Sequence, residues 1–99
     1  MKNFRTYQLA LELARQSKSI RLQAPYKDQF QRAILSIALN VAEGSGKSSG
    51  ADRRRFYEYA LGSFKEAKTI IDVLELQSLY RIADQLGANL FCLCRSLGH

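Results

Sequence analysis

The chain has 99 residues, of which 46% are hydrophobic and 24% charged, proportions that are typical of a globular domain and argue against wholesale disorder. It contains 15 Lys+Arg against 9 Asp+Glu, and the formal charge of +6 attracts polyanions such as nucleic acids. No apolar run is long enough to span a membrane, and no apolar block of a secretory signal follows the N-terminus. We therefore expect a cytoplasmic protein with no membrane partner.

Apolar residues recur at helical spacing from about residue 3 to residue 23, which predicts a first helix. Phe4, Tyr7, Leu11 and Ala14 form one apolar stripe, and Leu9, Leu13 and Ile20 lie beside it. Pro25 either ends this helix or begins the next one, because proline is excluded from helix interiors.

The second predicted helix, over residues 26–44, is the most apolar segment of the chain. Its expected core face consists of Phe30, Ile34, Ile37 and Val41. Leu35 and Leu39 widen this apolar arc. Such a wide arc favours burial on two sides, within the bundle and against a second subunit.

A run of Gly, Ser and Lys over residues 44–50 predicts a loop whose glycines turn the chain. Ser49 or Asp52 is expected to cap the third helix, over residues 51–75, by accepting hydrogen bonds from its free backbone N–H groups. Within that helix, Gly62 beside Ser63 leaves a slim surface. Because a glycine inside a helix costs about 1 kcal/mol relative to alanine, we expect a neighbour to approach closely there.

A fourth helix is predicted over residues 78–97, after a short connection that contains no glycine. No sustained alternation of apolar and polar residues indicates a strand. The sequence thus predicts an all-α fold, a single antiparallel up-down-up-down four-helix bundle that covers residues 1–99.

Gly46-Lys47-Ser48 matches the end of a phosphate-binding P-loop, G-x-x-x-x-G-K-[ST]. The first glycine of that motif is missing, because Val41 occupies its position. The segment before it is a predicted helix rather than a strand, so the backbone nest that holds phosphate would not form. These two departures exclude a P-loop nucleotide site.

Basic residues gather around the predicted start of the third helix, where free N–H groups and the helix dipole attract phosphate. The candidate nucleic-acid-binding residues are Lys47, Arg53, Arg54, Arg55, Lys65 and Lys68. Consecutive arginines point about 100° apart on a helix, so they cannot all reach one strand. The alternative is a solvated first turn in which Arg54 pairs with Glu58. Tyr57 and Tyr59 are expected to pack in the protein rather than to stack on bases.

No catalytic constellation is evident. The sole histidine is His99, and a terminal residue is poorly held for work as a base. Cys92 and Cys94 point to nearly opposite sides of a helix, so they cannot bridge each other or bind one metal, and we expect small core-filling thiols. We therefore predict no enzyme, no metal site and no cofactor.

Ser36, Asn40 and Glu43 form a thin polar line along the apolar second helix. In one interpretation this line is the solvent edge of the helix. In the other it faces the next helix or subunit, where Ser36 and Asn40 hydrogen-bond backbone near the loop. Glu43 would then pair with a basic residue such as Arg55 or an arginine of a neighbour.

The segments "SIALNVAEGSGK" and "RRFYEYALGSFKEA" resemble the signature of the four-helix-bundle proteins encoded within 23S ribosomal RNA intervening sequences. The matching positions are Ser36, Asn40, Val41, Ala42, Glu43, Gly44, Gly46 and Lys47, then Phe56, Ala60, Gly62, Ser63 and Glu66. Tyr7 stands where that family usually has tryptophan, Lys47 replaces an arginine, and the region after Ile71 is shorter than usual.

The resemblance implies an up-down-up-down bundle that assembles into a ring, typically a homopentamer. The chain is also similar to the accessory protein of diversity-generating retroelements, which is implicated in binding nucleic acid beside a reverse transcriptase. We therefore expect a non-enzymatic, oligomeric, nucleic-acid-binding bundle associated with RNA. The alternative is a protein-interaction scaffold that docks an acidic partner, such as a reverse transcriptase or a ribosomal component.

Overall fold

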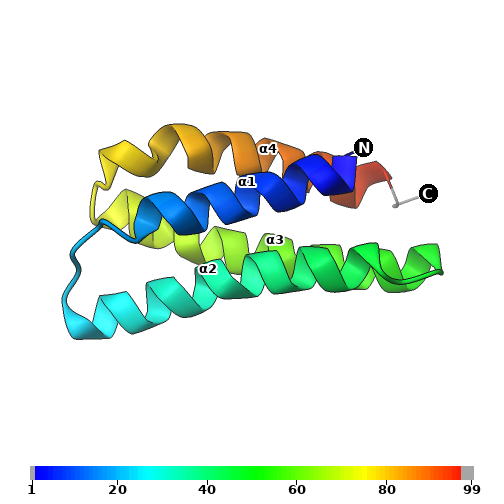
Figure 1. The fold of residues 1–99 in the computed structure, drawn as a ribbon, viewed down its shortest axis with the longest axis horizontal. Helices are drawn as coiled ribbons and strands as arrows, with labels where there is room; N and C mark the ends of the chain where they lie inside the picture. The colour runs from blue at the N-terminus through cyan, green and yellow to red at the C-terminus, as the bar shows by residue number, and fades with distance from the viewer. Residues whose placement is uncertain (1, 97–99) are drawn as a thin grey trace.

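The computed structural model describes residues 2–96, which form four α-helices joined by short connections (Figure 1). The α-helices are α1 (Lys2–Ser17), α2 (Ala24–Ser45), α3 (Gly50–Val73) and α4 (Tyr80–Ser96). One turn of 3-10 helix, η1 (Gln77–Leu79), precedes α4. Successive helices run in alternate directions along the long axis (Figure 1). The all-α prediction is confirmed, and no strand occurs within residues 2–96.

The first helix is shorter than predicted, since α1 ends at Ser17 rather than near residue 23. The Ser17 hydroxyl donates to the Ala14 carbonyl oxygen at 2.9 Å, which offers the backbone an alternative to helical bonding at this point. Pro25 begins the next helix, where its missing N–H costs no hydrogen bond. The second helix therefore starts at Ala24, two residues before the predicted position.

The end of α3 explains how the chain turns without a glycine. Glu75 adopts a left-handed conformation with φ 54°. The Leu76 N–H donates to the Ile71 carbonyl at 2.9 Å, and the Glu75 N–H donates to the Asp72 carbonyl at 3.2 Å. This is a Schellman motif with glutamate where glycine is usual. It ends α3 at Val73 rather than residue 75, and α4 begins at Tyr80 rather than residue 78. The predicted end at residue 97 lies outside the described residues.

The core face of α1 follows the second of the two predicted apolar stripes, which contains Leu9 and Leu13. The buried residues of this helix are Thr6, Leu9, Ala10 and Leu13. Phe4 is 60% exposed, and Tyr7, Leu11 and Ala14 are only partly buried. Both stripes are apolar, and the packing of α1 against α2 and α4 selects the one that turns inward.

The predicted core face of α2 is confirmed, because Phe30, Ile34, Ile37 and Val41 are all buried. Leu35 and Leu39 are each 59% exposed and lie on the other side of the helix. The wide apolar arc is therefore covered on one side only within this chain. No helix within residues 2–96 is both long and apolar enough to cross a membrane.

Two glycines allow aromatic rings to pack against a helix backbone. An alanine Cβ at Gly44 of α2 would lie 2.7 Å from the Tyr57 ring of α3. At Gly87 of α4 it would lie 2.6 Å from the Phe64 ring. By contrast, within residues 2–96 a Cβ built at Gly62 meets no atom of another element within 4 Å, so the close approach predicted there is not found in this part of the chain.

Candidate nucleic-acid interface

The loop between α2 and α3 is short and does not depend on glycine. It consists of residues 46–49, because Gly44 is helical and Gly50 begins α3. Gly46 has a φ of −87°, a value open to any residue, so the predicted turning role of the glycines is wrong. Ser49 caps α3 as one of the two predicted candidates, and its hydroxyl accepts from the Asp52 N–H at 3.1 Å.

The four cations beside this loop each have a partner within the chain. Lys47 pairs with Glu43 at 3.2 Å, Arg54 with Glu58 at 3.1 Å, and Arg55 with Asp52 at 3.7 Å. The Arg53 Nε donates to the Lys47 carbonyl oxygen at 2.7 Å. The alternative pairing of Arg54 with Glu58 is thus confirmed. Glu43 pairs with a basic residue as predicted, but that residue is Lys47 and not Arg55, which pairs with Asp52.

The net charge of this region is small. Residues 43–58 contain four cations and three carboxylates, so they contribute only +1 to the chain's +6. Because all three ion pairs are exposed, each contributes roughly 0–1 kcal/mol and can be exchanged for a phosphate. The region therefore carries a small net positive charge and is not a strongly positive surface.

An aromatic pair lies among these cations. The Phe56 ring has the Lys47 Nζ and the Arg55 Cζ each 5.1 Å from its centroid. It also meets the Tyr59 ring edge to face, with centroids 5.7 Å apart. Tyr59 is 54% exposed. We call Lys47, Arg53, Arg55, Phe56 and Tyr59 the loop-end cluster.

Sequence reasoning treated the two tyrosines alike, but the structure separates them. Tyr57 is 2% exposed and its hydroxyl lies 3.1 Å from the Ser45 hydroxyl, so the packing role predicted for it is confirmed. Tyr59 does not pack in the core of this chain. Its spacing of three from Phe56 was the only sequence signal that the two rings share one face of α3.

The remaining predicted cations lie on another side of α3. Arg54 and Lys65 act electrostatically on Cys94 of α4, which places them along the border with that helix. Lys68 pairs with Asp72 at 2.7 Å, and its hydrogen bond to Asp72 raises the pKa of the lysine. The six predicted residues therefore form two groups rather than one patch.

The polar line on α2 joins this helix to α3. The hydroxyls of Ser36 and Ser63 lie 2.7 Å apart, and the Asn40 Nδ2 donates to the Ser36 carbonyl oxygen at 2.9 Å and to its hydroxyl at 3.1 Å. All three side chains are half-buried. The inward interpretation is thus confirmed for Ser36, which contacts α3 directly, and Asn40 joins it through the Ser36 hydroxyl. The predicted hydrogen bonds to backbone near the loop are wrong, because Ser36 bonds a hydroxyl and Asn40 bonds within its own helix. Glu43 is exposed and lies outside this network.

The cysteines differ from the expectation of two core-filling thiols. Cys92 is exposed, so this prediction is wrong for it, and Cys94 is half-buried. Burial raises the pKa of the Cys94 thiol, and the Glu58 charge adds to the effect. His99 lies outside the described residues. Within residues 2–96 no three His, Cys, Asp or Glu side chains are grouped so that they could hold a metal ion.

Comparison with known proteins gives one match. No curated protein and no solved structure matches the chain significantly. A family model does match, and it covers residues 2–95 with all four helices and both signature segments. The chain belongs to the family of the 23S rRNA-intervening sequence protein.

Proposed function

We propose that the chain is a non-enzymatic, oligomeric nucleic-acid-binding bundle that contacts single strands through the loop-end cluster. The observation that carries this proposal is the exposed Tyr59 ring beside Phe56, with Lys47 and Arg55 against the Phe56 face. Single-strand-binding proteins combine such aromatic platforms for bases with cations for phosphates. RNA is the first ligand to test, because the family is named for a ribosomal RNA sequence.

The charges of the loop-end cluster favour weak binding in which a phosphate replaces a carboxylate partner. A strand that approaches the cluster would be attracted by the overall charge of +6 and would then replace the exposed carboxylate partners of Lys47 and Arg55. Each replacement costs little, because an exposed ion pair contributes at most about 1 kcal/mol. The binding should be strongly dependent on salt.

Fluorescence anisotropy with labelled single-stranded RNA of about 12 nucleotides tests the proposal. The log–log salt dependence should have a slope of about −0.7 per phosphate contact, so Lys47→Gln with Arg55→Gln should reduce its magnitude by about 1.4. Tyr59→Ala should weaken binding roughly 5- to 150-fold, the equivalent of about 1–3 kcal/mol per stacked base.

Two variants serve as matched controls. Tyr59→Phe retains the ring and should bind like the parent. Arg21→Gln removes a cation from the connection at the opposite end of the bundle and should also leave the Tyr59-dependent binding unchanged (Figure 1). Absence of binding at ~50 mM salt, to both RNA and DNA, would overturn the proposal.

Self-assembly is the second part of the proposal. The exposed leucines of α2, Leu35 and Leu39, together with Phe4 of α1, form apolar surface that a second copy of the chain would bury. Light scattering after size exclusion tests this, with a pentamer expected and Leu35→Lys expected to reduce the assembly. A monomeric parent would instead favour a scaffold that uses these residues to dock another protein, recovered in a pull-down after nuclease treatment.

A further inference from the structure

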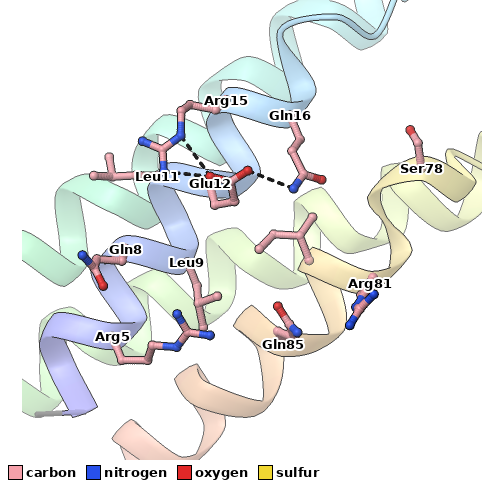
Figure 2. A pocket seen from close by; sticks show the side chains of 11 residues that line it. Arg5, Gln8, Leu9, Leu11, Glu12, Arg15, Gln16, Ser78, Arg81 and Gln85 are labelled. Atoms are coloured by element: carbon pink, nitrogen blue, oxygen red, sulfur yellow. Dashed lines mark hydrogen bonds and ion pairs between the residues drawn. The ribbon is translucent and has the colours of Figure 1, made fainter.

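A polar groove lies between α1 and α4 (Figure 2), and it shares no residue with the loop-end cluster. Its volume is about 640 Å³, which falls within the range of small-molecule sites. The buried side chains of Leu9 and Ile82 line it from the two helices. Its exposed lining includes three arginines, three glutamines and a serine.

Two of these arginines are free to bind a ligand. Arg5 of α1 reaches toward α4, where Arg81 and Gln85 lie one turn apart (Figure 2). Neither Arg5 nor Arg81 makes an ion pair or side-chain hydrogen bond within residues 2–96. This differs from the loop-end cluster, where every cation has a partner within the chain.

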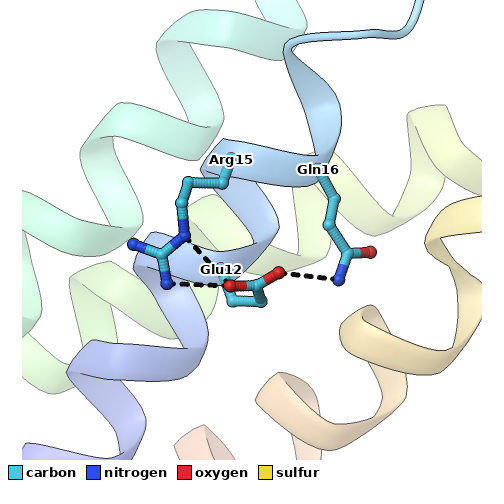
Figure 3. A network of polar contacts seen from close by, with 3 residues as sticks. All are labelled: Glu12, Arg15 and Gln16. Carbon is cyan, nitrogen blue, oxygen red and sulfur yellow. Dashed lines mark hydrogen bonds and ion pairs between the residues drawn. The ribbon is translucent and has the colours of Figure 1, made fainter.

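The only carboxylate that lines the groove is already occupied. Glu12 accepts from the Arg15 Nη2 at 2.8 Å and Nε at 3.0 Å through one oxygen, and from the Gln16 amide at 3.0 Å through the other (Figure 3). These hydrogen bonds lower the pKa of Glu12, the one from Gln16 having the larger effect and those from Arg15 the smaller, and so favour its ionised form. Glu12 therefore neutralises Arg15 and leaves Arg5 and Arg81 uncompensated.

The surrounding charges reinforce this imbalance. Residues 2–23 carry five cations and a single carboxylate, so they contribute +4 of the chain's +6. Asp84 lies one turn from Arg81 on α4, but the two make no ion pair within residues 2–96, and the Asp84 charge also acts on Lys68 of α3. α1 and the connection that follows it thus carry most of the net positive charge of the chain.

We propose that this groove binds a phosphate ester of nucleotide size, with Arg5 and Arg81 on the phosphate. Guanidinium groups match phosphate oxygens through two parallel hydrogen bonds. The amides of Gln8 and Gln85 can donate and accept, as a nucleobase edge or a ribose requires. Leu9 and Ile82 supply apolar surface beneath an uncharged ring. The ester can be a free nucleotide or one unit of a single strand.

Isothermal titration of the full chain with AMP tests the proposal, with adenosine as the ligand that lacks phosphate. AMP should bind, and adenosine should bind at least about tenfold more weakly, because it loses charge-assisted hydrogen bonds. Arg5→Gln and Arg81→Gln should each lower AMP affinity about tenfold or more. Arg5→Lys, which keeps the charge but loses the planar fork, should give an intermediate loss.

The control is Arg32→Gln, an exposed arginine on α2 that does not line the groove, and it should bind AMP like the parent. The proposal is wrong if AMP binds more weakly than about 10 mM, or if both groove variants bind it as the parent does. Because Arg5 and Arg81 are exposed, these variants should fold, which circular dichroism verifies.

Two further arms identify the source of the ester and separate this site from the proposed function. The ester is a unit of a strand if single-stranded RNA competes with AMP and binds the Arg5→Gln and Arg81→Gln variants more weakly. The ester is a free nucleotide if AMP binds but the RNA neither competes with it nor loses affinity in these variants. Lys47→Gln with Tyr59→Ala should abolish strand binding at the loop-end cluster and leave AMP affinity unchanged. Loss of AMP binding in that variant would contradict a separate groove site.

Discussion

Replacing Gly44 by alanine should destabilise the bundle, whereas the same replacement at Gly62 should stabilise it. Both glycines are helical and neither has a positive φ, so Gly62→Ala in the helix interior gains about 1 kcal/mol of helix propensity and Gly44→Ala, in the last turn of α2, gains at most that. At Gly44 the new Cβ would meet Tyr57 ring atoms at 2.7 and 2.9 Å and the Phe56 Cβ at 3.1 Å. At Gly62 it would meet nothing within 4 Å.

Whether Gly44→Ala raises or lowers the free energy of unfolding depends on whether the Tyr57 ring can move. The ring is buried in the core, and the tyrosine hydroxyl lies 3.1 Å from the Ser45 hydroxyl, so relief requires α2 and α3 to separate. Overpacking of this kind costs about 1–3 kcal/mol. Because two atoms of this buried ring lie within 3.0 Å of the new Cβ, we expect a cost in the upper part of this range, about 2–3 kcal/mol. After a gain in propensity of at most about 1 kcal/mol, Gly44→Ala should lose about 1–2 kcal/mol, and Gly62→Ala should gain about 1.

Thermal unfolding followed by circular dichroism measures both changes, at one protein concentration because assembly shifts Tm. For a domain of this size 1 kcal/mol corresponds to about 4–8 °C, so the two variants should melt on opposite sides of the parent. In a Tyr57→Leu background, which removes the clashing ring, Gly44→Ala should no longer be costly. A Gly44→Ala variant as stable as the parent would refute the steric argument. If Gly62→Ala instead has a lower Tm than the parent, and the difference grows with protein concentration, Gly62 lies at a contact between subunits.

Asn40→Ala should lower the free energy of unfolding by about 1 kcal/mol, because its amide donates twice to Ser36 in a half-buried network, whereas Glu43→Ala should stay within about 0.5 of the parent. Calorimetry of the two variants checks this, and equal losses would contradict the assignment. Iodoacetamide at about pH 8 should label the exposed Cys92 before Cys94. Burial and the Glu58 charge raise the pKa of Cys94, so a smaller fraction of this thiol is the reactive thiolate at that pH. Peptide mass spectrometry measures the two rates, which should converge in urea; equal rates in the folded protein would be inconsistent with the environment of Cys94.

The sequence alone determined the helices and much of the motif that holds α2 against α3. Helical periodicity predicted the all-α class, and the core face of α2 is the predicted one, because four apolar residues at helical spacing can be buried together only along one line. Local chemistry also narrowed the cap of α3 to Ser49 or Asp52, and the structure selects Ser49, whose hydroxyl accepts from the Asp52 N–H. The pairing of Arg54 with Glu58 follows from spacing on one helix in the same way.

Every feature that depends on which helices are neighbours could be known only from the tertiary structure. The face of α1 that turns inward could not be read from two adjacent apolar stripes, since only the packing against α2 and α4 distinguishes Leu9 from Phe4. The need for Gly44 arises from a ring on another helix. Arg5 and Arg81 carry no local signal at all, because each looks like an ordinary exposed cation on its own helix. They line one groove only because α1 and α4, at opposite ends of the sequence, pack side by side and bury Leu9 and Ile82 between them.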